Sequence, residues 1–344
     1  MSDLFSNLPP SAQAAYSELF DVALAHDLHR SISDLNGSFA AKEVKGRRYW
    51  YFQFRDLDGK VRQIYVGPDD DRVQELMARS GKLPDSPLVP FARSALALGC
   101  VGVIPAHFRI IRRLAEYGFF KAGGVLVGTH AFLAMGNMLG VVWADGARTQ
   151  DVDFAYSGKN ISIALPADIT VDVHAALESL AMGFLPITSF SGKAGATYIN
   201  PSRPDLRVDF LTSRHRGGDA PVVMPNLNIA LRPLKFMEYS MEHTLQTVIF
   251  CSEGAVTVNV PSPVRYALHK LLVWAERSSA YRAKANKDLR QSAALVAYFA
   301  EHNPEELIWA WQDMVSRGKG WEKRAVAGAH ALVRAYPDLP RPLL

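Results

Sequence analysis

The stretch that decides the fold is TQDVDFAY, residues 149–156, in which acidic and apolar residues alternate. Successive side chains of a β-strand point to opposite faces, so Asp151 and Asp153 share one face while Val152 and Phe154 enter the core. Two neighbouring carboxylates repel each other, and a strand gains no stability from them. Because Mg²⁺ prefers carboxylate oxygen and keeps positions open for nucleotide phosphates, the pattern predicts a metal-binding strand.

A third acid lies in a second apolar run, DLRVDFLT, where Asp209 follows Val208 and precedes Phe210. Turn residues at 201–204 predict an antiparallel hairpin over residues 196–212, which can bring Asp209 beside the first acidic strand. Three convergent carboxylates predict a two-metal site. One metal would orient a triphosphate, and the other would lower the pKa of an acceptor hydroxyl held in line with the α-phosphorus. Asp209 would be a shared ligand or the general base.

Asp172 is another acid between apolar residues and competes with Asp209 for the third position. The stretch after Asp168 has the spacing of a helix, with Ala175 and Leu177 among its apolar positions, and Asp168 suits the N-cap. We therefore favour Asp209 as the third carboxylate.

Upstream of the acids, the apolar run 125–127 predicts a buried strand that leads directly into Gly128, Thr129 and His130. A glycine-containing turn before a helix offers backbone N–H groups to a phosphate. Glycine is also common at such turns for conformational reasons alone. His130 would contact a phosphate or base, or would be a helix-start or core residue.

The N-terminal part is predicted to hold a helix within residues 9–35 and a β-hairpin over residues 46–68, joined at Asp58-Gly59. One face of the hairpin would carry Trp50, Phe52 and Phe54. The other would carry aromatic and basic residues, with further cations close by: Tyr49, Tyr51 and Arg55, with Arg47, Arg48, Lys60 and Arg62. Two interpretations remain open, since such a surface can stack on bases or can cover a helix with a solvated basic rim.

Helices are also predicted over residues 70–79 and 91–118, separated by a proline-rich linker at 82–90. Another helix should begin at Pro263. Along it Lys270, Arg277 and Lys284 recur at seven-residue spacing on roughly one face, where they would meet phosphates or form a solvated surface.

Together Gly128-Thr129, Asp151-Val152-Asp153 and Asp209 resemble the pattern of the minimal nucleotidyltransferases of the polymerase-β superfamily. The resemblance looks closest to a bacterial family that carries an aromatic and basic hairpin ahead of the core, here RRYWYFQFRD and QIYVGPD. It spans residues 37–300. Two departures are Thr129 in place of the usual second small residue and a longer separation from turn to acids, which implies an inserted loop around residues 145–146.

This resemblance implies an α+β fold with a mixed sheet flanked by helices. It implies four regions: a helix and hairpin accessory region (1–83), a linker (84–94), a catalytic core (95–260) and a C-terminal helical domain (261–344). It further implies Lys270 as a triphosphate ligand and Lys287 with Asp288 at the edge of the site. The expected cofactor is Mg²⁺ or Mn²⁺, and the expected substrate is an NTP.

The composition is that of an ordinary globular protein, with 344 residues, 49% hydrophobic and 21% charged. No apolar run reaches the roughly 18 residues that span a bilayer, and the N-terminus lacks the features of a signal peptide. With only Cys100 and Cys251, which we expect to be buried, the chain suits a reducing compartment, so a cytoplasmic location is expected. The net charge of +4 favours anionic partners. The absence of GxSxG, GxGxxG, Walker A and HExxH patterns leaves hydrolase, dehydrogenase, P-loop and zinc-enzyme interpretations without support.

Two functional hypotheses follow. In the first, the chain transfers NMP from an NTP to an RNA end, a protein hydroxyl or a small acceptor, while Arg47, Arg48, Tyr49 and Tyr51 contact the acceptor. In the second, it is a catalytically inactive module of this fold that binds nucleic acid or protein. Retaining three mutually repulsive acids favours the enzyme. The sequence leaves the acceptor, the preferred base and the oligomeric state open.

Overall fold

A computed structural model gives the three-dimensional structure of the chain. It describes residues 4–28, 38–44, 46–55, 61–80, 87–144, 149–156, 171–187, 196–214, 218, 220–277 and 281–339. The predicted turn at Asp58-Gly59, the predicted cap Asp168 and the predicted loop around residues 145–146 lie outside the described residues.

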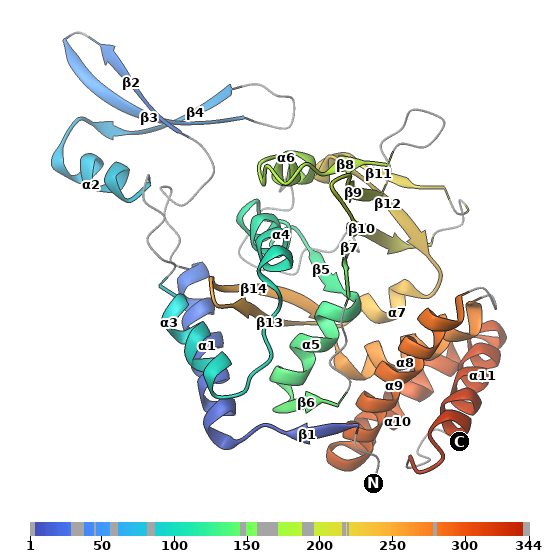
Figure 1. Ribbon diagram of the computed structural model, residues 1–344. Helices are drawn as coiled ribbons and strands as arrows, with labels where there is room; N and C mark the ends of the chain where they lie inside the picture. The colour runs from blue at the N-terminus through green and yellow to red at the C-terminus, as the bar shows by residue number, and fades with distance from the viewer. Residues whose placement is uncertain are drawn as a thin grey trace.

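The acid-bearing strands lie inside a seven-stranded mixed sheet (Figure 1). Its order is β11-β12-β10-β7-β5, and β9 pairs with both β10 and β8. Strand β7 is parallel to β10 and antiparallel to β5, which confirms the mixed sheet. The strands are β5 (Gly124–Val127), β7 (Asp151–Tyr156), β8 (Leu185–Pro186), β9 (Thr197–Asn200), β10 (Arg203–Ser213), β11 (Val222–Met224) and β12 (Ile229–Leu234).

The apolar side chains of β7 and β10 form the core behind the acids, as the alternation predicted. Val152, Phe154, Val208 and Phe210 are all fully buried. The rings of Phe154 and Phe210 stack at 5.5 Å, and Phe119 meets both edge-on. Burying each of these large side chains stabilises the fold by about 1.5–3 kcal/mol, so the register of the two strands, and with it the acid positions, is set by this core.

The predicted helix 91–118 is two helices, α3 (Val89–Ala97) and α4 (Pro105–Glu116). The prediction of one continuous helix was therefore wrong. Gly99 adopts a φ of +111°, which ends the helical path after α3, and Pro105 begins α4 at a position where its missing N–H costs nothing. The predicted stop at Gly118, with φ +86°, follows α4 directly.

Helix α1 (Pro10–Leu28) packs against the main body, although the expected accessory region 1–83 joins it to the hairpin. Ala12 and Leu19 are buried in one cluster with Ala92 of α3 and Phe250 of β13. Residues 89–94 of the expected linker belong to α3, where Val89 and Ala92 are buried. The neighbouring hairpin is β13 (Thr244–Cys251) with β14 (Gly254–Pro261), and strand β1 (Phe5–Asn7) pairs with β6 (Val141–Trp143). Cys100 and Cys251 are free and buried, as expected.

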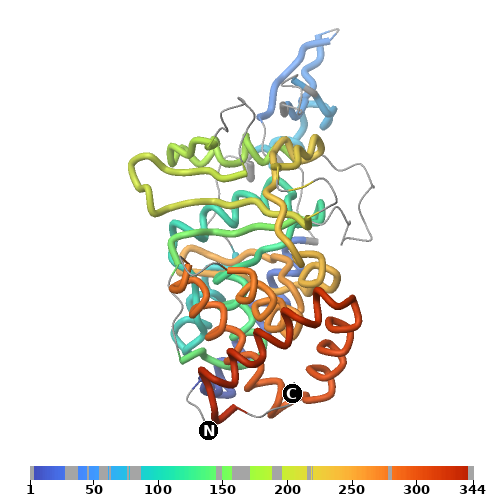
Figure 2. Tube along the Cα trace, turned by 90° about the vertical axis from the view of Figure 1, so that its right-hand side faces the viewer, coloured from blue at the N-terminus to red at the C-terminus, as the bar shows by residue number. Residues whose placement is uncertain are grey.

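Four C-terminal helices pack beside the sheet, as Figure 2 shows from the side. They are α8 (Pro263–Glu276), α9 (Arg282–His302), α10 (Pro304–Ser316) and α11 (Lys319–Ala335). Helix α8 begins at Pro263, as predicted. Because α8 ends at Glu276, Lys284 lies on α9 and does not share a single helix face with Lys270, so that part of the prediction was wrong. No helix in the described ranges is long and apolar enough to cross a membrane.

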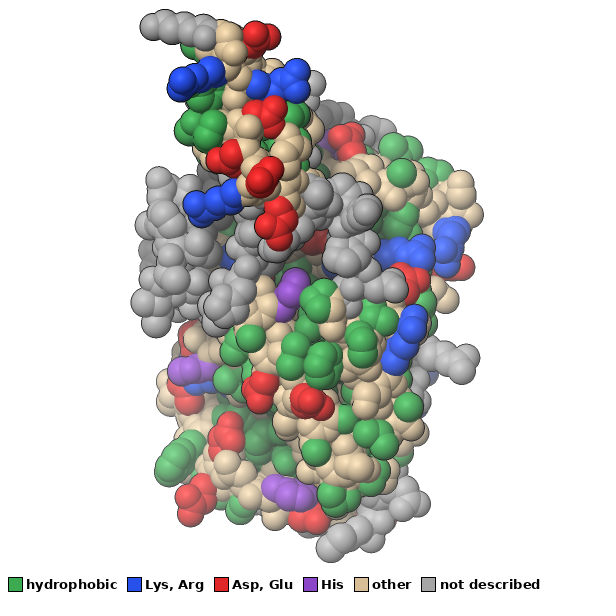
Figure 3. All heavy atoms as spheres, turned by 90° about the vertical axis from the view of Figure 1, so that its left-hand side faces the viewer, with side chains coloured by type: hydrophobic (Ala, Val, Ile, Leu, Met, Phe, Trp, Pro, Cys, Tyr) green, Lys and Arg blue, Asp and Glu red, His purple; other side chains and the backbone are tan. Residues whose placement is uncertain are grey.

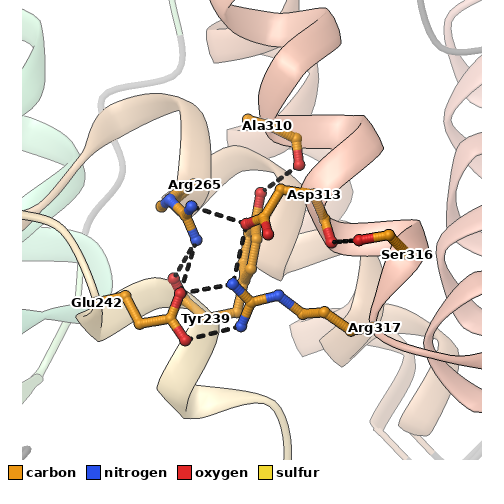
Figure 4. A network of polar contacts seen from close by, with 7 residues as sticks. All are labelled: Tyr239, Glu242, Arg265, Ala310, Asp313, Ser316 and Arg317. Carbon is orange, nitrogen blue, oxygen red and sulfur yellow. Dashed lines mark hydrogen bonds and ion pairs between the residues drawn. The ribbon is translucent and has the colours of Figure 1, made fainter.

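A network of charges joins the short helix α7 (Met237–Met241) to α8 and α10 (Figure 4). Arg265 donates to Asp313 at 2.7 Å and to Glu242 at 3.1 Å, and Arg317 also donates to both carboxylates. Both guanidinium groups lie within 5 Å of the Tyr239 ring. The network fixes the helical layer against α7, whose Met237 and Met241 pack on the sheet beside the acids.

The predicted hairpin is present as β3 (Arg47–Arg55) and β4 (Val61–Pro68), and the predicted helix near 70–79 is α2 (Asp71–Ser80). A third strand that the sequence analysis missed, β2 (Ser38–Val44), pairs with β3. Figures 1 and 3 show this small sheet and α2 standing out from the rest of the molecule.

Candidate active site

Asp151, Asp153 and Asp209 come together on one face of the sheet. In the parallel pairing of β7 with β10, Asp209 lies directly opposite Asp153, and Arg207 lies opposite Asp151. Residues opposite each other on neighbouring strands project from the same face, so the three carboxylates and Arg207 share it. The sequence predicted the three acids. Arg207 was missed, although it stands two residues before Asp209 and alternation along the predicted strand places both on one face.

Gly128 lies against the middle carboxylate of this group. It begins α5 (Gly128–Met138) with a φ of +65°, and a Cβ at this position would overlap Asp153 Oδ2. Only glycine therefore suits both the backbone conformation and the close approach of the acid. The N-cap residue Val127 supplies no side-chain hydrogen bond, which leaves the first amides of this helix available to an anion.

The side chains of Thr129 and His130 are both buried, so a phosphate at this helix end would meet only their backbone amides. His130 Nε2 lies 2.9 Å from His107 Nδ1. Burial, followed by the charges of His107 and Lys287, lowers the pKa of His130 to about 3. His130 is therefore a neutral core side chain at physiological pH, which agrees with the core interpretation.

Asp209 is held on the side away from Asp153. The Thr197 hydroxyl on β9 donates to Asp209 Oδ1, and an Arg232 nitrogen on β12 lies 3.7 Å from the same oxygen. Within the described part of the chain, Oδ2 has no hydrogen-bond partner. The antiparallel pairing of β9 with β10 confirms the predicted hairpin over residues 196–212, but Thr197 was not singled out within it. Arg232 was missed because nothing in its local sequence shows that β12 lies along β10.

Asp153 is the carboxylate that is most destabilised by burial and by its acidic neighbours. Burial, followed by the charges of Asp209 and Asp151, raises the pKa of Asp153 from 3.8 to about 6, although Lys270 and Lys287 act in the opposite direction. Carboxylate oxygens that repel each other are ligands that a hard divalent cation binds. As the described side chains stand, no three His, Cys, Asp or Glu are grouped closely enough to hold one ion. The residues fit such an ion by their chemistry and by the repulsion that it would relieve.

Lys270 and Arg277 both bind Asp288, on α9. Lys270 Nζ donates to one carboxylate oxygen at 2.9 Å, and Arg277 Nε donates to the other at 2.5 Å. Burial alone would raise the pKa of Asp288, but the two cations hold it below its usual range. The same contact outweighs burial at Lys270, whose pKa is raised, so Lys270 stays charged near Asp153. Asp288 is thus the partner of Lys270 and Arg277 rather than of Lys287.

Lys287 is a half-buried cation that makes no hydrogen bond or ion pair with another described residue. Burial and the charge of Lys270 lower its pKa, and the carboxylates of Asp153 and Asp151 oppose that shift. It is therefore close to the acids without being neutralised by a partner of its own.

Tyr266 connects the helical layer to the glycine turn. Its hydroxyl lies 2.9 Å from the Gly128 carbonyl oxygen and 2.9 Å from the Gln291 amide oxygen. Burial raises the pKa of Tyr266 to about 12, so the hydroxyl keeps its proton. No sequence pattern points to Tyr266, because its role depends on the packing of α8 against α5.

Asp172 has a structural role. It is the N-cap of α6 (Val173–Glu178), where its Oδ1 accepts from the Ala175 amide at 2.8 Å and from Asn228 Nδ2 at 3.0 Å. The helix therefore begins after Asp172 rather than after Asp168, and this capping role separates Asp172 from the three convergent acids.

Arg47, Arg48, Tyr49 and Tyr51 lie on β3, in a different sheet from the acids. Arg48 lies 3.8 Å from Asp69. These four residues are therefore not part of the acid site, and any acceptor contact that they make is a separate one.

The family to which the chain belongs bears on this site. The sequence profile of a nucleotidyltransferase family matches residues 106–316. Among solved structures, the chain is similar to an antigenic nucleotidyltransferase-like protein from Paracoccidioides brasiliensis, with 16% identity and a TM-score of 0.31 over 66% of this chain and 95% of that chain. No curated protein is similar enough to the chain to count as a match. The family match begins after the small β2–β4 sheet, so the resemblance of that sheet to one bacterial family stays a prediction.

Proposed function

The chain belongs to the nucleotidyltransferase family, and we propose that it transfers NMP from an NTP to an acceptor hydroxyl at Asp151, Asp153 and Asp209. The observation that carries the proposal is the position of Asp153, which lies directly opposite Asp209 on the sheet and against Gly128 at the start of α5. The three acids can bind metal ions, and the first amides of α5 and Lys287 can bind phosphates. Together they suit a metal-bound triphosphate.

In this proposal the chain binds the triphosphate through the amides at the start of α5 and through Lys287. Tyr266 holds the glycine turn, and Asp288 holds Lys270 near the acids. Mg²⁺ or Mn²⁺ bound to the three carboxylates would neutralise phosphate charge and lower the pKa of the acceptor hydroxyl. The acceptor oxygen bonds to the α-phosphorus, the bond from that phosphorus to the β-phosphate oxygen breaks, and pyrophosphate leaves. The proton of the acceptor hydroxyl passes to Asp209 or, if Asp209 would instead be a ligand shared by the ions, to solvent.

The experiment incubates the full chain with each α-labelled NTP, Mg²⁺ or Mn²⁺, and total cellular RNA or protein. We expect a divalent-dependent labelled product from the wild type and none from Asp151→Asn. Asp172→Asn is the matched control, because asparagine also caps helices well and Asp172 lies outside the acid group. A folded Asp151→Asn variant with unchanged turnover would contradict the assignment.

A further inference from the structure

The β2–β4 sheet has one covered face and one open face. On the covered face Phe52 is only 1% exposed, its ring lies 5.2 Å from that of Phe39, and the Val73 side chain of α2 packs close to Gly67 of β4. The strand registers place residues one position away from Phe39 and Phe52 along their strands on the other side of the sheet. We call this side the tyrosine face and define it by Lys42, Arg47, Tyr49, Tyr51, Gln53 and Tyr65.

Three rings form a cluster on the tyrosine face. The Tyr65 ring lies 5.5 Å from that of Tyr51 and 6.2 Å from that of Tyr49. Lys42 Nζ lies 4.8 Å above the Tyr51 ring. Tyr65 remains 54% exposed, so these rings are not the core of the small sheet, whose core is on the side of α2.

The two sides of this unit differ in charge. The described part of the tyrosine face carries Lys42 and Arg47 and no carboxylate. Glu43 and Arg48 have the opposite parity, and α2 brings Asp71 and Arg72, so the other side carries both signs of charge. Figure 3, seen from the left-hand side of Figure 1, shows Lys and Arg as well as Asp and Glu side chains on this unit. The tyrosine face is therefore complementary to an anionic partner that offers flat apolar surfaces.

We propose that the tyrosine face binds a single-stranded nucleic acid and that this strand is the acceptor of the transfer. The acceptor role rests on the proposed function. Every base has a π-face that can stack on an exposed tyrosine, whereas the bases of a duplex are already stacked on each other. Antiparallel sheets that carry two or three aromatic rings on an open face bind single strands in this way. Lys42 and Arg47 meet the phosphates between the stacked bases.

The test measures fluorescence anisotropy of a labelled single-stranded RNA of mixed sequence with the full chain, in chelator and without NTP. Replacing Tyr65 with Ala should weaken binding about 5- to 150-fold, the loss typical of one stacked base, and Tyr65→Phe should restore it because the ring is kept. Arg47→Ala should reduce the slope of log affinity against log salt by about 0.7. Trp309→Ala is the matched control, because it removes a 68% exposed ring from α10.

Several results would overturn the proposal: no binding of single strands, equal binding of a duplex, or unchanged affinity in Tyr65→Ala. Labelling of a protein acceptor that depends on Tyr65, without binding of any polynucleotide, would assign the face to a protein instead. Equal binding of RNA and DNA supports the proposal and shows that the 2′-hydroxyl is not recognised.

The binding assay is independent of catalysis, so the two proposals can fail separately. Asp153→Asn should bind the single strand like the wild type. If this variant binds the strand but the wild type turns over no NTP, the proposed function fails, and the tyrosine face remains a binding surface. If label is transferred but never to a strand bound at Tyr65, the acceptor role fails instead.

Discussion

Asp153 is the residue at which burial, two neighbouring carboxylates and a close glycine act together. Its pKa is raised from 3.8 to about 6, so the folded chain holds this proton more tightly than the unfolded chain does. Ionising Asp153 therefore reduces stability as pH rises from about 4 to about 6, and the full penalty is present above about pH 6. A bound divalent cation would remove much of it.

Because ionisation of Asp153 destabilises the folded chain, we predict that Asp153→Asn is stabilised and that the gain grows with pH. In chelator at about pH 7.5, we expect the variant to melt about 2–8 °C above the wild type, because it lacks the ionisation penalty. At about pH 4.5 the wild-type carboxyl is largely protonated, and the difference should shrink. Scanning calorimetry at both pH values checks this. If the variant is less stable than the wild type at the higher pH, the ionised Asp153 carboxylate does not destabilise the folded chain.

Asp209 differs from Asp153 because Thr197 and Arg232 engage one of its oxygens. We predict that Asp209→Asn lowers kcat about 10²- to 10⁴-fold while the dissociation constant for Mg²⁺-ATP changes less than about 3-fold, since its role belongs to the transition state. Single-turnover assays paired with calorimetric titration separate the two quantities. Asp172→Asn is the control and should change neither. The opposite outcome for these two variants would mean that the third carboxylate is Asp172.

Lys287 is the described cation beside the acids that has no partner of its own. We predict that Lys287→Ala weakens Mg²⁺-NTP binding about 10-fold, because one positive charge near the phosphates is lost, and leaves the melting temperature nearly unchanged. Lys284→Ala, which removes an exposed cation from the same helix, is the control. Equal nucleotide affinity in the two variants would remove Lys287 from the site.

Among the elements, α8 depends on the network of Arg265, Arg317, Glu242 and Asp313 to keep its place against α7. Arg265 is only 13% exposed at its side chain and contacts both carboxylates. We predict that Arg265→Ala lowers the free energy of unfolding by about 2–4 kcal/mol, because Arg317 alone must then neutralise both acids. Urea denaturation measures the loss. Arg334→Ala, an exposed cation on α11, should cost less than about 0.5 kcal/mol.

The elements show where sequence patterns were sufficient. Alternation in DVDF and VDFL predicted two strands, their buried faces and the shared acid face, because the period of a strand is two and the core requires one parity. The split between α3 and α4 was missed, since residues 98–104 keep enough apolar side chains to continue a helical pattern across Gly99. The capping role of Asp172 was missed, because a helix that starts one turn earlier, after Asp168, has almost the same pattern.

On the scale of the whole molecule, the site is assembled from segments far apart in the sequence. The strands bring the acids, α5 brings the glycine turn, and α8 and α9 bring Lys270, Tyr266 and Lys287. Local patterns predicted the acids and the turn, because each lies within one element. They missed Thr197, Arg232 and Tyr266, because these act only through packing between elements. Lys287 was implied by resemblance alone.

The most direct test of the central claim follows two labels on one NTP. The full chain is incubated with Mg²⁺ and NTP labelled at the α-phosphate or at the γ-phosphate, together with single-stranded RNA, and Asp153→Asn is run beside it. NMP transfer predicts that the α-label enters the acceptor, that the γ-label leaves in pyrophosphate, and that Asp153→Asn does neither. Transfer of the γ-label to the acceptor, or equal transfer of the α-label by a folded Asp153→Asn variant, would contradict the account.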